Sequence, residues 1–119
     1  MNTKKNPFNN AFRGFKWFAQ SQWNFKIHIL ATILAFASAL ILKISLIEWV
    51  VIILSIALVW VSELLNTAIE FTLDKLHPAH DKLIGKAKDV AAAAVLMASF
   101  TALIVGALIF IPRILSTIT

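Results

Sequence analysis

The chain has 119 residues, of which 60 % are hydrophobic and 14 % are charged, and its mean hydropathy is +0.83. This balance excludes an ordinary soluble domain and indicates a protein that folds in a lipid bilayer. The chain contains no cysteine, which excludes disulfides, a cysteine-ligated zinc site and a thiol nucleophile. The formal net charge is +5, but the distribution of the basic residues favours a membrane topology over nucleic-acid binding.

Residues 8–23 predict an amphipathic helix that lies in the membrane interface. Phenylalanines recur at spacings of three and four from Phe8 to Phe15, and basic and amide side chains fill the other faces. Trp17 and Trp23 suit the headgroup region, where tryptophan is common. A purely anchoring role would explain this segment as well as a functional one.

Three apolar segments predict membrane spans at about 27–44, 47–73 and 86–112, since a spanning helix takes about 20 residues. The first two are joined by a very short turn and should form an antiparallel hairpin. Pro112 closes the third. We expect one integral-membrane domain over residues 1–119, all-α, with the surface helix preceding three transmembrane helices.

The basic residues predict the orientation. Nine of them lie before the first span or between the second and third, and two lie on the other side: Lys4, Lys5, Arg13, Lys16, Lys26, Lys75, Lys82, Lys86 and Lys88 against Lys43 and Arg113. By the positive-inside rule, the N-terminus and the 75–89 loop face the cytoplasm.

The second span carries a polar stripe at its cytoplasmic end. Glu63, Asn66, Glu70 and Asp74 stand at offsets of 0, 3, 7 and 11, which share one helix face. A carboxylate at membrane depth costs roughly 2.5 kcal/mol or more, so such residues usually have a function. The alternative is a seam that only joins helices by hydrogen bonds.

The loop after the stripe contains His77, Pro78 and His80, and the third helix follows it. Pro78 should end the second helix, and two histidines around a proline are weak evidence for a metal site. Carboxylates that bind a divalent cation or act as a base, together with lysines that neutralise phosphate, are the components of phosphoryl transfer. Neither a GxxxxGK[ST] loop nor a protein-kinase glycine-rich loop is present.

Two motifs together resemble a known family. Glu63-Leu-Leu-Asn66-Thr-Ala-Ile-Glu70 with Asp74, followed by Lys86-Ala-Lys88-Asp89-Val-Ala-Ala-Ala-Ala-Val-Leu, is similar to the signature of the prokaryotic integral-membrane diacylglycerol kinases, which include the undecaprenol kinases. The resemblance extends over nearly the whole chain. The segments around Asn24 to His28 and Ile47 to Trp49 are more similar to the undecaprenol kinase branch.

The resemblance implies a homotrimeric lipid kinase of the bacterial inner membrane, with active sites shared between subunits and with ATP, Mg²⁺ and a membrane lipid alcohol as partners. It implies that Glu63 is the general base, that Glu70 binds the metal on ATP and that Asn66 supports the phosphates or the metal. By the same resemblance, Asp74 lies at the edge of the nucleotide site, Lys88 holds the polyphosphate and Asp89 orients it or pairs with a nearby base.

One position departs from the family pattern. Relatives have a carboxylate near the entrance of the first span, whereas no acidic residue occurs here before Glu48. Gln22 and His28 occupy that neighbourhood and are the candidate substitutes. Gln22 offers a neutral oxygen, but imidazole is a poor ligand for Mg²⁺.

Two other classes of function remain open from the residues. A small proton- or cation-coupled transporter would use the Glu63 and Glu70 stripe as a relay, but gives no reason for the lysines of the third helix. A noncatalytic scaffold would tolerate neutralisation of both glutamates. Whether the lipid is diacylglycerol or undecaprenol stays open, because both present a hydroxyl at the interface.

Overall fold

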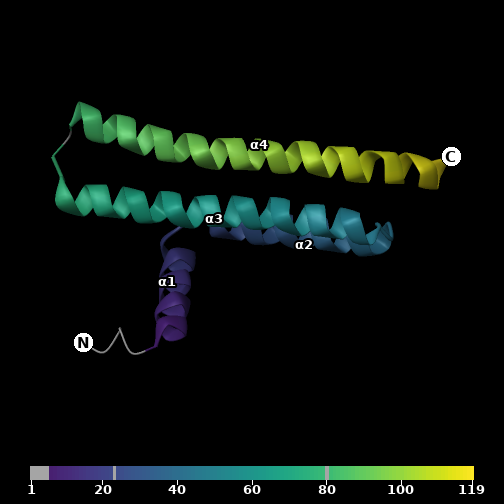
Figure 1. Ribbon diagram of the computed structural model, residues 1–119, viewed down its shortest axis with the longest axis horizontal. Helices are drawn as coiled ribbons and strands as arrows, with labels where there is room; N and C mark the ends of the chain where they lie inside the picture. Colours follow the sequence, from purple (N-terminus) through teal and green to yellow (C-terminus); the bar gives the residue numbers. More distant parts are fainter. Residues whose placement is uncertain (1–5, 23, 80) are drawn as a thin grey trace.

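A computed structural model describes residues 6–22, 24–79 and 81–119, which form four helices in these ranges (Figure 1). They are α1 (Pro7–Ser21), α2 (Phe25–Ile41), α3 (Leu46–Leu76) and α4 (Lys82–Ile118). The helices α3 and α4 lie side by side as a long antiparallel hairpin, α2 runs along the first part of α3, and α1 lies across the bundle (Figure 1). The prediction of an all-α chain is therefore confirmed.

Two helices in the described ranges, α3 and α4, are long and apolar enough to span a membrane. The helix α2 has 17 residues, about 25 Å at 1.5 Å per residue, which is short for a hydrocarbon core of about 30 Å. It passes the same test only when taken with α1, and the pair is bent by 106°. The first span therefore remains a prediction, whereas the second and third have the length and composition that spanning requires.

Side-chain caps begin three of the helices. The Asn6 side chain accepts hydrogen bonds from the first turn of α1, with Pro7 at the first helical position. Ser45 and Glu48 form a reciprocal capping box at the start of α3, and Asp81 accepts from two backbone N–H groups of α4. These caps set helix starts that apolar periodicity alone does not fix.

Several helix ends differ from the prediction. Trp23, expected to complete the surface helix, lies outside the described residues. The helix α4 begins at Lys82 instead of residue 86, because Asp81 caps it there, and continues past Pro112 to Ile118. A proline removes one backbone hydrogen bond, but such helices continue in membranes where neighbouring groups compensate. The helix α4 therefore does not end at Pro112, and the end of the third membrane span stays a prediction.

An ion pair joins α3 and α4 at the end of the bundle where α3 begins. Arg113 Nη2 lies 2.5 Å from Glu48 Oε1, which also accepts from the Ser45 backbone N–H at 2.9 Å. Glu48 thus joins the start of α3 to the end of α4. Beneath this pair lies a small apolar core, made of Ala39, Ile44, Ile52 and Ile109.

An aromatic cluster holds α1 and α2 against α3. The rings of Phe15, Phe18, Phe25 and Trp60 have centroid separations of 5.5 to 6.4 Å, the range of favourable aromatic pairing. Nearby, Trp17 packs edge-on against Phe71 at 4.3 Å. The surface helix is thus anchored along the part of α3 that carries the polar stripe.

Candidate active site

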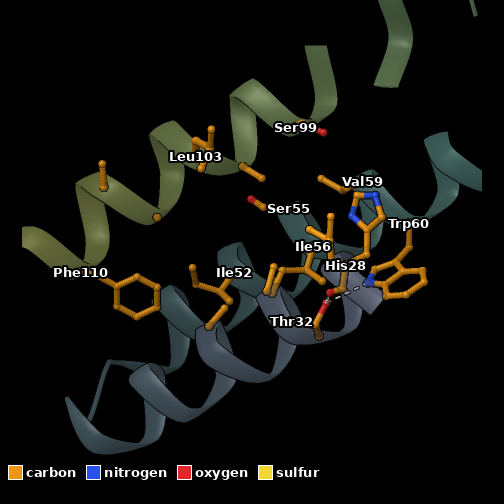
Figure 2. A pocket seen from close by; sticks show the side chains of 16 residues that line it. His28, Thr32, Ile52, Ser55, Ile56, Val59, Trp60, Ser99, Leu103 and Phe110 are labelled. Carbon is orange, nitrogen blue, oxygen red and sulfur yellow. Dashed lines mark hydrogen bonds between the residues drawn. The ribbon is translucent and has the colours of Figure 1, made fainter. Parts of the chain in front are cut away.

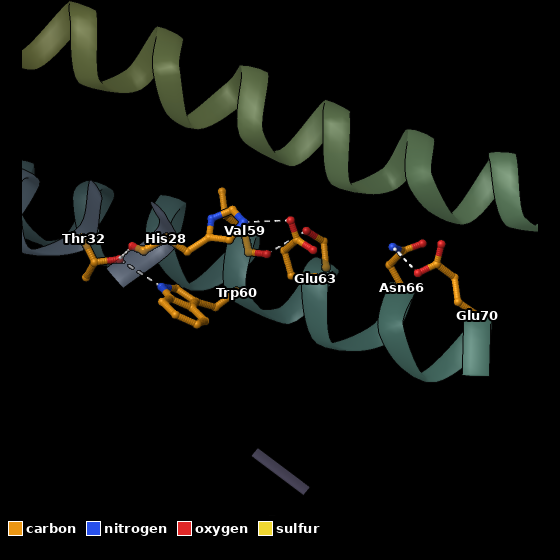
Figure 3. A network of polar contacts seen from close by, with 8 residues as sticks. His28, Thr32, Val59, Trp60, Glu63, Asn66 and Glu70 are labelled. Atoms are coloured by element: carbon orange, nitrogen blue, oxygen red, sulfur yellow. Dashed lines mark hydrogen bonds and ion pairs between the residues drawn. The ribbon is translucent and has the colours of Figure 1, made fainter. Parts of the chain in front are cut away.

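The polar stripe occupies one face of α3 beside α4 (Figure 3). Glu63 is 8 % exposed, Asn66 and Glu70 are partly exposed, and Asp74 lies near the end of the helix, where it is exposed. Glu63 and Asp74 are about 16 Å apart along the axis, at 1.5 Å per residue. The stripe therefore runs from a buried carboxylate to an exposed one.

Glu63, the deepest member, is paired with a histidine from another helix. His28 Nε2 of α2 lies 2.8 Å from Glu63 Oε1 (Figure 3). An ionised carboxylate can only accept hydrogen bonds, so Nε2–H is the donor when Glu63 is charged. The pair brings a residue of the first predicted span directly to the stripe.

A second hydrogen-bonded chain fixes the position of His28. The Thr32 hydroxyl donates to the His28 carbonyl at 2.8 Å, and Trp60 Nε1–H donates to that hydroxyl at 3.0 Å. The Trp60 ring lies 5.8 Å from the imidazole. Sequence reasoning missed Thr32 and Trp60, although helical spacing places Thr32 one turn after His28 and Trp60 one turn before Glu63.

The middle of the stripe offers oxygen ligands. Asn66 Nδ2–H donates to Glu70 Oε1 at 3.5 Å, and Asn66 Oδ1 is buried without a hydrogen-bond partner in the described structure. The Thr67 hydroxyl also has no hydrogen-bond partner in the described structure, and this residue is only 2 % exposed. Sequence reasoning did not identify Thr67.

No group of three or more acidic or histidine side chains that could hold a metal occurs among the described residues. Mg²⁺ usually takes one or two carboxylates and completes its shell with substrate phosphates and water. Glu70 and the unpaired Asn66 oxygen are therefore too few for a permanently bound metal, but they suit a metal that binds together with a nucleotide.

The exposed end of the stripe meets α4. Lys88 Nζ forms an ion pair with Asp74 Oδ1, which joins the two motifs across the hairpin. Asp89 follows Lys88 on α4 and is exposed. The ion pair thus brings the two motifs together at one end of the α3–α4 hairpin.

An apolar cavity of about 490 Å³ lies between α2, α3 and α4 (Figure 2). His28 and Trp60 stand at one end and Phe110 lies toward the other, with the hydroxyls of Thr32, Ser55 and Ser99 in a mainly aliphatic lining. The cavity therefore begins at the residue that holds Glu63.

Comparison with known proteins decides the family. The sequence pattern of the family described as prokaryotic diacylglycerol kinase matches residues 9–110. The chain belongs to that family. This membership makes the chain a lipid kinase of the diacylglycerol or undecaprenol kinase type, as the motifs predicted.

Individual relatives of this diacylglycerol kinase family member carry two names. The chain is 38 % identical over 107 residues to the undecaprenol kinase of Bacillus subtilis, covering 90 % of this chain and 87 % of the relative. It is 36 % identical over 110 residues to a diacylglycerol kinase of Synechocystis, and 40 % identical over 74 residues to that of Escherichia coli. It spans 63 % and 61 % of the length of those two proteins.

The two entrance-site candidates differ in position in this lipid kinase. Gln22 is the C-cap of α1, where its backbone N–H donates to the Phe18 carbonyl and its own carbonyl accepts from Phe25. His28 contacts Glu63, at the opposite end of the stripe from Asp74. His77 pairs with Asp81 at 3.2 Å, and His80, the other histidine of this loop, lies outside the described residues.

Proposed function

We propose that the protein transfers the γ-phosphoryl group of ATP to the hydroxyl of a membrane lipid alcohol at the cytoplasmic membrane surface. The observation that carries this proposal is the order of groups along one face of α3. A buried carboxylate lies beside an apolar cavity, amide and carboxylate oxygens follow, and at the exposed end Asp74 is paired with a lysine of α4. The order matches a substrate with an apolar chain, a reacting hydroxyl and a polyphosphate.

In this reaction Glu63 accepts the proton of the lipid hydroxyl as its oxygen attacks the γ-phosphorus. Glu70 and Asn66 would hold Mg²⁺ bound with ATP, and the ion would supply positive charge to neutralise the transferred phosphoryl group. Lys88 moves from Asp74 to the phosphate oxygens, since a cation paired at the surface is weakly held. Asp74 and Asp89 border the nucleotide, and ADP and a lipid phosphate are released.

Undecaprenol is the lipid that we propose first. The relative named undecaprenol kinase matches over a larger share of its own length than the two named diacylglycerol kinase. The apolar cavity that ends at His28, the partner of Glu63, also suits one long chain with a terminal hydroxyl. Diacylglycerol is the competing substrate.

The proposed arrangement in the membrane follows from the charges. With α2, α3 and α4 as spans and α1 at the interface, the basic residues of α1 and of the α3–α4 loop face the cytoplasm. ATP then reaches the exposed end of the stripe. We further propose a homotrimer of the bacterial inner membrane, as the family resemblance implies.

The test is a phosphorylation assay on purified protein in mixed micelles with labelled ATP and Mg²⁺, in which undecaprenol and diacylglycerol are offered separately. Label in undecaprenol alone supports the proposal in full, and label in diacylglycerol alone corrects the lipid. Label in neither lipid, from protein that also fails to bind ATP, overturns the kinase proposal. Proton-coupled flux in vesicles without ATP would then favour the transporter.

A further inference from the structure

We propose that His28 is a positioning residue for Glu63, holding the carboxylate by one oxygen so that the other faces the lipid hydroxyl. This inference rests on the proposed function, because it assigns the orientation of the proposed base. It also replaces the metal-ligand role that the sequence suggested for His28. The Nε2 atom lies 2.8 Å from Glu63 Oε1, so the nitrogen lone pair or proton at that position is already engaged.

The imidazole bonds to Glu63 and packs beside the Trp60 ring, and the backbone of the same residue is tied to α3 through Thr32. Thr32 donates to the His28 backbone carbonyl, Trp60 donates to Thr32, and the Trp60 ring packs beside the imidazole (Figure 3). Trp60 is itself packed among Phe15, Phe18 and Phe25. A side chain fixed in this way can hold the carboxylate without searching among rotamers, which is the condition for precise placement of a catalytic group.

The surroundings leave Glu63 as the ionisable partner of His28. The ring beside the imidazole is that of Trp60, which packs in turn against Phe15 of α1 and Phe25 of α2. On the α4 side, the cavity that His28 lines is completed by Ser99 and aliphatic side chains. Within the described structure, α3 contributes the one charged group that bonds to it. The interaction is directional because a single donor meets a single carboxylate oxygen. Its loss should therefore change the orientation of the Glu63 carboxylate more than the electrostatic environment of ATP.

The His28 and Glu63 pair also lies at the boundary between the apolar cavity and the polar stripe. His28 lines the end of the apolar cavity, whereas Glu63 begins the polar stripe (Figures 2 and 3). A hydroxyl carried at the end of an apolar chain in this cavity therefore arrives at the pair. The structure thus assigns His28 to the orientation of the base and to the lipid side of the reaction.

Replacement by a residue of similar size that cannot donate, with rescue by one that can, tests this role. We expect His28→Leu to lower kcat for lipid phosphorylation about 10- to 100-fold, the range for a group misplaced by about 1 Å, with KM for ATP within twofold of wild type. His28→Gln retains an N–H donor and should recover most of kcat. His77→Leu, in the α3–α4 loop, is the matched control and should keep wild-type kcat.

A double-mutant cycle separates positioning of Glu63 from a general structural effect. In a Glu63→Gln background, His28→Leu should cause no further loss, because the two residues act as a unit. An additive loss, a His28→Leu variant with wild-type kcat, or a change confined to KM for ATP would each overturn the inference. Each variant is first checked for the wild-type oligomer mass and helix content.

A measurement without substrate distinguishes this inference from the proposed function. The ¹⁵N resonances of the His28 ring in micelles should shift in Glu63→Gln and stay unchanged in Glu48→Gln. A shift shows that the pair exists even if the wild-type protein phosphorylates neither lipid, in which case the function fails and the contact stands. An unchanged His28 ring in Glu63→Gln overturns the pair itself, including when His28→Leu does not fold.

Discussion

Glu63 combines deep burial with a hydrogen bond from a neighbouring helix, the setting of a base that must be held in place. We predict that Glu63→Gln lowers kcat about 10²- to 10⁴-fold, the usual contribution of general acid–base catalysis. The variant should remain folded and should still bind ATP, because the amide is isosteric and the nucleotide end of the stripe is unchanged. The assay is labelled phosphate transfer from ATP to lipid in mixed micelles.

The control for this variant lies on the same helix. Glu48→Gln makes the same chemical change at the opposite end of α3, where Glu48 pairs with Arg113. It should keep kcat within twofold of wild type. Wild-type turnover by Glu63→Gln would remove Glu63 as the base.

Glu70 stands two helical turns from Glu63 and beside the unpaired oxygen of Asn66. We predict that Glu70→Gln raises the Mg²⁺ concentration for half-maximal activity about tenfold, because a carboxylate ligand is replaced by a neutral one. Saturating Mg²⁺ should restore part of kcat, which it should not do for Glu63→Gln. The measurement is activity against free Mg²⁺ at saturating ATP, and an unchanged midpoint would contradict the assignment.

The start of α4 depends on one carboxylate. The hydrogen bond from His77 lowers the pKa of Asp81 from its ordinary value of 3.8, and the backbone N–H groups of Ile84 and Leu83 add to this effect. Because the folded pKa lies below the unfolded one, the stabilisation is fully present above pH 3.8 and is lost as the pH falls through the folded value. Acid should therefore loosen the first turn of α4.

Hydrogen exchange at Leu83 and Ile84 checks this prediction, with rates corrected for the intrinsic pH dependence. Protection of both amides should be constant near neutral pH and should fall below pH 3.8. Asp81→Ala should show low protection at every pH, because the cap is absent. Protection in the wild-type protein that does not change across this range would contradict the prediction.

The helices were more predictable than their ends and contacts. Apolar runs and Pro78 give α3 and α4 directly, because helices are set by local pattern. The cap at Asp81 and the continuation through Pro112 depend on individual hydrogen bonds and moved both ends of α4. Helical period placed the stripe on one face of α3, and the roles of its residues still rest on the experiments above.

The contacts between helices could not be predicted from the sequence. The pairing of His28 with Glu63 requires the register of α2 against α3, which the packing of Trp60 among phenylalanines determines. The Glu48 and Arg113 pair likewise joins residues of two helices that are far apart in the chain. The periodicity of a single helix cannot predict either contact, and His28 was therefore considered only as a substitute for the missing entrance carboxylate.

At the scale of the whole molecule, the charge pattern predicts which ends face the cytoplasm. Because the chain has no cysteine, one introduced cysteine is its sole thiol. In cells, Ala79→Cys in the α3–α4 loop should be protected from a membrane-impermeant maleimide, whereas Ser116→Cys near the end of α4 should be labelled. Permeabilised cells should label both, and the reverse pattern in intact cells would invert the proposed topology.

Assembly is the remaining property of the whole molecule. A single chain provides few ligands around Glu70, and α3 keeps large apolar side chains such as Leu58 and Leu65 exposed. Neighbouring subunits that pack on α3 would cover these apolar side chains and would add ligands to the site. Identical contacts of this kind can close into a ring. The proposed trimer should therefore have three times the chain mass of 13.2 kDa by native mass spectrometry.

Subunit mixing then tests whether the sites are shared. We predict that inactive Glu63→Gln and Lys88→Met chains, unfolded together and reassembled in equal amounts, recover about a quarter of wild-type activity, because random assembly places an intact Glu63 beside an intact neighbouring Lys88 at that frequency. Each variant reassembled alone should stay inactive. If the mixture also stays inactive while it forms trimers, Glu63 and Lys88 act within one chain, an arrangement that the ion pair of Lys88 with Asp74 across the α3–α4 hairpin would allow.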